Sequence, residues 1–367
     1  MIPIKSFKHL YDIIDTSFVR TQICRAAAHK EKRPYVHRVL QQLDQCTEEI
    51  TENLLNQKIL LHPHLKKELY DPHSKKTRQL QIPLFYPDHI YCWCFVQMFM
   101  PAFRRGMYQH VYSSIPSRGL DRALKVVQHW IQDDPHNTQY VCEMDVHRFY
   151  ASVDQAILTA QLERICHDQK ALWLAHQLIS SVPSGLPIGD YPSPWFANFY
   201  LQGLDHFIKE ECHIPYYQRY MDNLILFSSN KEHLHSSYRK IEEYTHERLH
   251  LQFGRNHQIY PLTRGLDYLG LVFYPTHTLL RARNFLAFTR QARDLCWRID
   301  NNEEISLHET LSVSCRLAMV RRCNSYNIIN KYLPPEYEME LRRICGKMMS
   351  RHMKQKYQQQ QLKLHKE

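Results

Sequence analysis

The chain has 367 residues, 44% of them hydrophobic, so it can bury a sizeable core in one large unit or in two to three subdomains. With only nine glycines, it is neither loop-rich nor of low complexity. The net charge of +10 predicts an anionic partner, either nucleic acid or a membrane surface. No apolar run approaches the length of a membrane span, and we expect no membrane partner.

The cysteines and the N-terminus bear on the cellular compartment. The 11 cysteines are scattered, and Cys92 and Cys94 lack the spacing of a zinc knuckle. We interpret them as reduced core residues of a cytoplasmic protein. Residues 1–5 do not begin a signal peptide, which agrees with that location.

The N-terminal part is predicted to be largely helical. Residues 1–70 are polar, with apolar residues at helical spacing. A basic patch at residues 75–78 precedes an alternation of apolar and polar residues over 80–84. An apolar run typical of a helix follows over residues 89–103.

Two acidic motifs each lie beside a β-like segment. Residues 138–147 predict a buried strand that ends in Asp145, and residues 152–155 predict the start of a helix through a capping box. Farther on, Tyr220-Met221-Asp222-Asn223 lies between two apolar segments, which predicts a hairpin with Asp222 at its tip. Short turns with Asp and Asn are common, so the pair of motifs is far more specific than either alone.

A loop, a strand pair and several helices complete the prediction. Residues 185–194 form a glycine-bearing loop, and Ser193-Pro194 predicts a helix start with Ser193 as its cap. Residues 265–274 predict a strand pair. The remaining predicted helices cover residues 284–300, 306–331 and 335–357.

Basic charge gathers at the C-terminal end. Residues 281–367 contain 17 Lys and Arg against 9 Asp and Glu, so they hold +8 of the total +10. A solvated helical surface would give the same count, but the acidic motifs lie elsewhere, which favours a surface that grips nucleic acid. The candidate nucleic-acid-binding residues are Arg290, Arg293, Arg321, Arg322, Arg342 and Arg343.

In this order, the motif at Asp145, the segment 185–198 and the motif at Asp222 resemble motifs A, B and C of the reverse transcriptase palm. The resemblance covers about residues 75–275. It implies an α+β right-hand polymerase fold with fingers, an RRM-like antiparallel palm sheet and a helical thumb. The implied ranges are 1–137 for the N-terminal region and fingers, 138–280 for the palm and 281–367 for the basic thumb and tail.

The resemblance implies nucleotidyl transfer by two divalent metal ions about 3.5–4 Å apart. Mg²⁺ prefers hard oxygen ligands. The implied metal-binding residues are Asp145, Val146, Asp222 and Asn223, of which Asp145, Asp222 and Asn223 are catalytic. The family usually has a second acid where this chain has Asn223. An amide oxygen still ligates a cation, but one negative charge is lost, so weaker Mg²⁺ affinity and use of Mn²⁺ are expected.

Further residues are assigned to the substrates only through the resemblance. Arg78 would contact the dNTP triphosphate through its guanidinium, and Tyr150 would lie under the sugar and exclude a 2′-hydroxyl. Without the resemblance, Tyr150 is simply a core residue. The remaining assignments are Ile188, Gly189 and Ser193 for dNTP binding, and Tyr268, Leu269 and Gly270 for the primer grip.

The implied partners are an RNA template, a DNA primer or product, and dNTPs. The chain has neither of the retron signatures, and we expect no endonuclease of the kind that group II intron proteins often carry, because the sequence ends too soon for one. Ile188-Gly189 fits diversity-generating retroelement enzymes, but these usually carry Gln where this chain has Pro194. The defence-associated or unclassified bacterial group remains, which implies a dedicated non-coding RNA and a protein partner or second copy. An alternative from another class is a nucleic-acid-binding scaffold of a polymerase complex, which Asn223 and the basic tail also fit.

Overall fold

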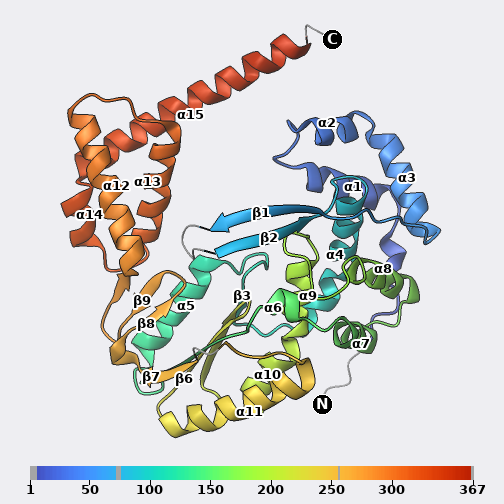
Figure 1. The fold of residues 1–367 in the computed structure, drawn as a ribbon, viewed down its shortest axis with the longest axis horizontal. Helices are drawn as coiled ribbons and strands as arrows, with labels where there is room; N and C mark the ends of the chain where they lie inside the picture. Colours follow the sequence, from blue (N-terminus) through green and yellow to red (C-terminus); the bar gives the residue numbers. More distant parts are fainter. Residues whose placement is uncertain (1–5, 72–75, 255–256, 365–367) are drawn as a thin grey trace. The chain divides into compact units, whose positions relative to one another are not determined.

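The computed structural model describes residues 6–71, 76–254 and 257–364 (Figure 1). The chain divides into two compact units, Met1–Gly119 with Tyr140–Ile259 and Leu120–Gln139 with Tyr260–Glu367. These units divide the chain at positions other than the three ranges predicted from the sequence. The limits of fingers, palm and thumb therefore stay predictions.

A five-stranded sheet lies mainly in the first unit. Its strands, in spatial order, are β3 (Val111–Tyr112), β5 (Tyr216–Tyr220), β6 (Asn223–Ser228), β4 (Tyr140–Asp145) and β7 (Gln258–Pro261). β6 pairs antiparallel with both β4 and β5, whereas β3 pairs parallel with β5. The predicted strand that ends in Asp145 and the predicted hairpin are both confirmed.

Helices surround this sheet within the first unit. They are α4 (Asp88–Arg105), α6 (Phe149–Ser152), α7 (Gln155–Ile165), α8 (Gln169–Ile179), α9 (Ser193–Tyr200), α10 (Gln202–Glu210) and α11 (Lys231–Leu249). Two predicted helix starts are corrected. The side chain that caps α7 is Asp154 rather than Ser152, because Ser152 ends α6. Ser193 is the first residue of α9 and not its cap, which is Pro192 and makes no side-chain hydrogen bond.

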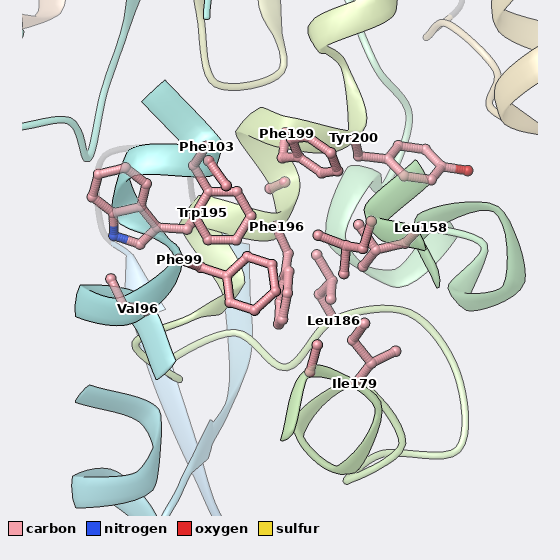
Figure 2. Packing of buried hydrophobic residues seen from close by; sticks show 14 of the residues in the cluster. Val96, Phe99, Phe103, Leu158, Ile179, Leu186, Trp195, Phe196, Phe199 and Tyr200 are labelled. Atoms are coloured by element: carbon pink, nitrogen blue, oxygen red, sulfur yellow. The ribbon is translucent and has the colours of Figure 1, made fainter. Parts of the chain in front are cut away.

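Aromatic packing fixes α9 and the loop before it. Figure 2 shows Phe196 and Phe199 of α9 beside Phe99 and Phe103 of α4, with Leu186 of the loop in the same cluster. All five side chains are buried. Each buried side chain of this size contributes roughly 1.5–3 kcal/mol relative to an exposed one. This core therefore anchors the loop and helix start that carry Ile188, Gly189 and Ser193, which are predicted to bind the dNTP.

The N-terminal part of the first unit contains helices and one hairpin. The helices are α1 (Thr16–Ala27), α2 (Pro34–Gln41) and α3 (Leu43–Leu55), and the hairpin strands are β1 (Leu65–Asp71) and β2 (Lys76–Ile82). The antiparallel register runs from Leu65 opposite Ile82 to Asp71 opposite Lys76. Lys75 of the predicted basic patch lies outside the described residues.

The second unit combines a small sheet with helices. They are α5 (Leu120–Asp133), β8 (Leu266–Tyr268), β9 (Leu271–Phe273), β10 (Thr278–Leu280), α12 (Ala282–Asp300), α13 (Leu307–Val320), α14 (Tyr326–Tyr332) and α15 (Pro335–Leu364). The prediction of a single helix over residues 306–331 is wrong, because this segment forms two helices, α13 and α14, separated by residues 321–325. α15 also continues past its predicted end at residue 357. Among the described residues, no helix is both long and apolar enough to span a bilayer.

Candidate active site

The acidic residues lie at one end of the central sheet. β4 ends at Asp145, whose partner in the antiparallel register with β6 is Asn223. Opposite residues in such a pair have Cβ atoms roughly 4.5–5.5 Å apart. Met221 and Asp222 form the turn between β5 and β6, and the amide of Val146 donates a 3.1 Å hydrogen bond to the Asp222 carbonyl. The structure thus brings together all four residues predicted to bind metal.

Asp222 has the electrostatics of a cation ligand. Burial raises the pKa of the Asp222 carboxyl above its ordinary value, although its own backbone and the positive charge of Arg78 act in the opposite direction. The side-chain amide of Asn223 donates a hydrogen bond of 3.3 Å to this carboxylate. A poorly solvated carboxylate gains from a nearby cation, so a divalent metal ion would be stabilised here.

The carboxylate oxygens of this site suit Mg²⁺ if the substrate completes the coordination of the ion. In the described part of the chain, no three or more His, Cys, Asp and Glu side chains gather to hold a metal ion. The carboxylates of Asp145 and Asp222 would offer a cation hard oxygen ligands without forming a closed cage. Mg²⁺ is commonly bound by one or two carboxylates together with substrate phosphates and water, and this arrangement suits such a site.

Tyr150 and Arg78 belong to the same neighbourhood. The Tyr150 hydroxyl donates a hydrogen bond of 3.6 Å to the sulfur of Met221, next to Asp222. Burial raises the pKa of Tyr150, the negative charge of Asp222 adds to this effect, and Arg78 opposes it. Arg78 of β2 and Tyr150 of α6, far apart in the sequence, thus both lie within electrostatic range of Asp222.

The loop before α9 approaches both β2 and α6. The amide of Gln81 in β2 donates a 2.7 Å hydrogen bond to the carbonyl of Ile188. Gly185 has a φ of 65°, and a Cβ there would lie 2.6 Å from the carbonyl oxygen of Tyr150. A glycine is required where the backbone comes so close. At Gly189 (φ 117°), a Cβ would meet the Gln81 carbonyl at 3.3 Å.

The sequence analysis missed Gln155, which holds this loop in place. Its side-chain amide nitrogen lies 3.0–3.1 Å from the carbonyl oxygens of Ile179, Val182 and Gly185. Its position at the start of α7 gives no local signal of this contact, because the partners are up to 30 residues away.

A buried ion pair under the hairpin was also missed. Arg219 is fully buried, and its guanidinium donates two 2.7 Å hydrogen bonds to the carboxylate of Asp205 on α10. The same guanidinium donates to Asn198 of α9 (3.1 Å) and to the carbonyl of Met221 (2.9 Å). Tyr217 donates a further hydrogen bond to Asp205. Arg219 therefore links the hairpin turn to the helices beneath it.

Met221 shows why the turn needs such support. Its φ is 59°, which is uncommon for a residue other than glycine. Such a conformation costs of the order of 1–3 kcal/mol and persists where surrounding contacts fix it. The hydrogen bond from Arg219 to the Met221 carbonyl is one of these contacts.

The predicted primer-grip and thumb residues lie in the second unit. Tyr268 ends β8, and Leu269 and Gly270 form the turn to β9 with positive φ values of 49° and 93°. Of the six thumb arginines, four form ion pairs: Arg321 and Arg342 with Glu338, Arg343 with Glu340, and Arg322 with Asp121. Arg290 and Arg293 are exposed on α12, where Arg293 lies 4.8 Å from the Tyr332 ring.

The chain matches the family model described as reverse transcriptase (RNA-dependent DNA polymerase) over residues 85–271, about half of its length. It therefore belongs to the reverse transcriptase family, a class of RNA-directed DNA polymerases and hence of nucleotidyltransferases. The α+β architecture with its mainly antiparallel central sheet is accordingly a right-hand polymerase fold, as the resemblance implied. No curated protein matches the sequence.

Solved structures of telomerases from Candida species are similar to this chain. Apo telomerase from Candida tropicalis has a TM-score of 0.46 and 13% identity over 78% of this chain and 64% of that one. A form truncated from the C-terminal domain gives 0.44 and 11%, over 65% and 60%. Candida albicans telomerase in complex with a fragment of telomeric RNA gives 0.42 and 9%, over 67% and 54%. The chain spans less than two thirds of each, and the family assignment rests on the sequence match.

Proposed function

We propose that this chain adds dNTPs to a 3′-hydroxyl on an RNA template by a two-metal mechanism. The observation that supports the proposal is the convergence of Asp145, at the end of β4, with Asp222 in the β5–β6 turn. When bound, two Mg²⁺ or Mn²⁺ ions would activate the hydroxyl and hold the triphosphate. Asp145, Asp222, Asn223 and the backbone of Val146 are the proposed ligands.

The other residues of the site would position the dNTP. The guanidinium of Arg78 would neutralise part of the triphosphate charge, which is the task for which its fork of donors is suited. The ring of Tyr150 would leave no room for a 2′-hydroxyl. The backbone at Ile188 and Gly189, together with Ser193, would contact the nascent base pair.

Primer extension on an RNA template tests the assignment of the carboxylates. Asp145→Ala and Asp222→Ala should each reduce dNTP incorporation to background with Mg²⁺ and with Mn²⁺, while circular dichroism shows an unchanged fold. Glu247→Ala, an exposed acid on α11, is the matched control and should retain activity. Incorporation by either active-site variant at the wild-type rate would overturn the two-metal assignment.

For the biological role, we propose a bacterial enzyme of the defence-associated or unclassified group that copies a dedicated non-coding RNA. The support is the lack of retron signatures in the sequence. A diversity-generating retroelement enzyme is the second candidate, favoured by Ile188-Gly189. Sequencing the nucleic acid that copurifies with the protein tests the role: one discrete RNA with complementary DNA is expected, and a broad sample of cellular RNA would count against a dedicated template.

A scaffold role is the candidate from another class. The observation that favours it is Asn223, which removes one negative charge from the proposed metal site. A scaffold would bind primer–template but incorporate no dNTP with either metal ion. Incorporation that depends on Asp145 would exclude this role.

A further inference from the structure

Two histidines lie just before β1, at the base of the hairpin β1–β2 that carries Arg78 (Figure 1). His62 lies against Asp88, the first residue of α4. His64 lies against Asp190, in the loop before α9. Both aspartates are buried, with exposed fractions of 2% and 6%. The base of the hairpin, α4 and the loop are therefore joined by two histidine–carboxylate pairs.

The pair of His62 with Asp88 anchors the segment to α4. The backbone amide of His62 donates a 3.1 Å hydrogen bond to the Asp88 carboxylate, and the imidazole Nδ1 lies 3.0 Å from its other oxygen. Asp88 therefore keeps a backbone donor whatever the imidazole does. The second pair is different, because it depends on the side chain of His64 and reaches the loop of the candidate active site.

The carboxylate of Asp190 is held from two sides. Its Oδ1 accepts hydrogen bonds from the backbone amide of Tyr191 (2.8 Å) and from the thiol of Cys92 on α4 (3.2 Å). Its Oδ2 lies 3.6 Å from the Nε2 of His64. This Nε2 is buried and has no hydrogen-bond partner in the described part of the chain. A movement of about 0.5 Å would bring the pair within hydrogen-bond distance.

Two other titratable side chains near Asp190 do not offset its charge. Burial raises the pKa of the Cys92 thiol well above its ordinary value, and the charge of Asp190 adds to this effect, so the thiol stays protonated. Burial lowers the pKa of His89 to about 4, and Lys30 lowers it further, so His89 is uncharged at pH 7. A buried carboxylate is costly unless it is paired, and the Nε2 of His64 is placed to pair with it.

Both members of this pair adjoin the proposed dNTP site along the chain. Asp190 directly follows Gly189, which is assigned to the dNTP. His64 directly precedes Leu65, which is opposite Ile82 in the first register position of the hairpin. A contact between the two side chains therefore sets how the base of the hairpin meets the loop.

The length of the hairpin amplifies a movement at its base. Arg78 lies four residues before Ile82 in β2. At about 3.3 Å per residue, its Cα is roughly 13 Å from the base. The hydrogen bond from Gln81 to the Ile188 carbonyl is a second link between β2 and the loop, and it too lies near the base. A small tilt about the base would therefore displace the Arg78 guanidinium by a larger distance.

We propose that His64 and Asp190 are positioning residues for the incoming dNTP, because their contact holds the base of the hairpin against the loop and so aligns Arg78 with Gly189. The proposal rests on the proposed polymerase function. Neither side chain is assigned to the substrates or the metal ions, so the pair acts through Arg78 and the loop. Its loss should weaken dNTP binding and leave the chemistry at Asp145 and Asp222 intact.

Primer extension at increasing dNTP concentration separates positioning from catalysis. His64→Phe keeps a ring but cannot donate to Asp190. It should raise KM for dNTP roughly 2- to 10-fold, the size expected for the net contribution of one hydrogen bond, with kcat unchanged. His64→Gln should keep KM near the wild-type value, because its amide nitrogen can replace Nε2.

Asp190→Asn tests the other side of the contact without a change in size. It should raise KM as His64→Phe does. The double variant should be no worse than the worse single one, because both changes remove the same interaction. Multiplied effects in the double variant would show that the two residues act independently and would contradict the pairing.

Hydrogen–deuterium exchange observes the hairpin without dNTP, metal ion or nucleic acid. Exchange in β1, β2 and residues 185–191 should be faster in His64→Phe and Asp190→Asn than in the wild type or His64→Gln. His176 provides the matched control, since its Nε2 lies 3.5 Å from Glu163 and also has no hydrogen-bond partner in the described chain. His176→Phe should change neither KM nor exchange in the hairpin. Thermal denaturation checks that all variants are folded.

Several results would overturn the proposal. The pair does not position the hairpin if His64→Phe and Asp190→Asn leave KM and hairpin exchange at wild-type values, or if His64→Gln is as impaired as His64→Phe. A lower Tm with an unchanged KM would reduce the pair to a packing contact. If hairpin exchange responds as expected but even the wild type incorporates no dNTP with either metal ion, the contact between hairpin and loop stands and the proposed polymerase function fails.

Discussion

At the scale of single residues, the hairpin turn carries one carboxylate fewer than the family usually provides. Asn223 faces Asp145 across the β4–β6 pair and donates a hydrogen bond to Asp222. It therefore stabilises the ionised form of Asp222 without adding negative charge. An amide and a carboxylate are nearly the same size. An exchange of Asn for Asp at position 223 should therefore change the metal affinity without changing the geometry of the site.

Asn223→Asp should lower the Mg²⁺ concentration that gives half-maximal primer extension. A second carboxylate beside Asp222 strengthens attraction for a divalent cation. Titration of the rate with Mg²⁺ measures the effect, and Asn223→Ala serves as the opposite control, with a higher requirement. An unchanged titration curve for both variants would remove Asn223 from the list of metal ligands.

The pKa of Asp222 predicts how pH affects the metal-free protein. Since burial raises this pKa in the folded chain, the folded state binds the proton more tightly than the unfolded state. The stabilising effect is complete below the ordinary pKa of 3.8 and is lost as the pH rises through the folded value. Metal-free Asp222→Asn should therefore have a higher Tm than wild type at pH 7, and the difference should shrink in acid.

Mg²⁺ provides the internal control for this measurement. It should raise the Tm of the wild type, since it binds only the folded state, and raise that of Asp222→Asn much less. Equal Mg²⁺ shifts in both proteins would show that the ion binds elsewhere.

Tyr150 is predicted to set the choice of sugar. Tyr150→Val should raise the ratio of rNTP to dNTP incorporation by opening the space beside the sugar. Tyr150→Phe keeps the ring and loses only the hydroxyl contact with Met221, so the ratio should stay near that of the wild type. The ratio of kcat/KM values measures the effect, and an active Val variant with the wild-type ratio would contradict the assignment.

At the scale of elements, the buried pair of Arg219 and Asp205 connects β5 with α10 and supports the Met221 turn. Neither side chain is exposed. Removing one partner of a buried pair leaves an uncompensated charge, whereas replacing both by apolar residues is often neutral. Comparing a single variant with the double variant therefore separates the effect of the ion pair on stability from its effect on the candidate active site.

Asp205→Asn should lower the free energy of unfolding by about 3–5 kcal/mol and reduce kcat. The double variant Asp205→Leu, Arg219→Met should recover much of the stability but not kcat, because the hydrogen bond to the Met221 carbonyl is still missing. Chemical denaturation and single-turnover kinetics measure the two effects. Recovery of kcat together with stability would mean that the pair acts on folding alone.

At the scale of the whole molecule, the basic excess is partly neutralised within the chain. Four of the six candidate thumb arginines are already paired with carboxylates. Exposed pairs of this kind contribute little to stability, with a typical value of about 0–1 kcal/mol. They do reduce the charge offered to a phosphate, so Arg290 and Arg293 of α12 are better placed to contact nucleic acid than these four.

Replacing Arg290 and Arg293 by Gln should flatten the log–log salt dependence of duplex binding by about two units, at about 0.9 for each phosphate contact. Replacing Arg321 and Arg322 should flatten it less, since each already has a carboxylate partner. Anisotropy titrations at salt concentrations between about 50 and 200 mM measure both slopes. Equal slopes in all three proteins would contradict a nucleic-acid-binding role for these four arginines.

The sequence by itself determined the features that are local in the chain. The strand that ends at Asp145 and the hairpin with Asp222 follow from short apolar segments beside turn residues. Arg342 and Glu338 are four residues apart, and Arg343 and Glu340 three, so these ion pairs follow from helical spacing. Helix starts were less predictable, since Ser152 and Asp154 are both suitable caps and only the end of α6 decides between them.

Only the tertiary structure decided which distant groups meet. The contact of Gln155 with three carbonyls, the pair of Arg219 with Asp205, and the pair of Arg322 with Asp121, 201 residues apart, have no periodic signal. The same is true of the pair of His64 with Asp190. Patterns of hydrophobicity and turn residues report which face of one element is buried, whereas the pairing of polar groups depends on how buried faces from separate segments pack together.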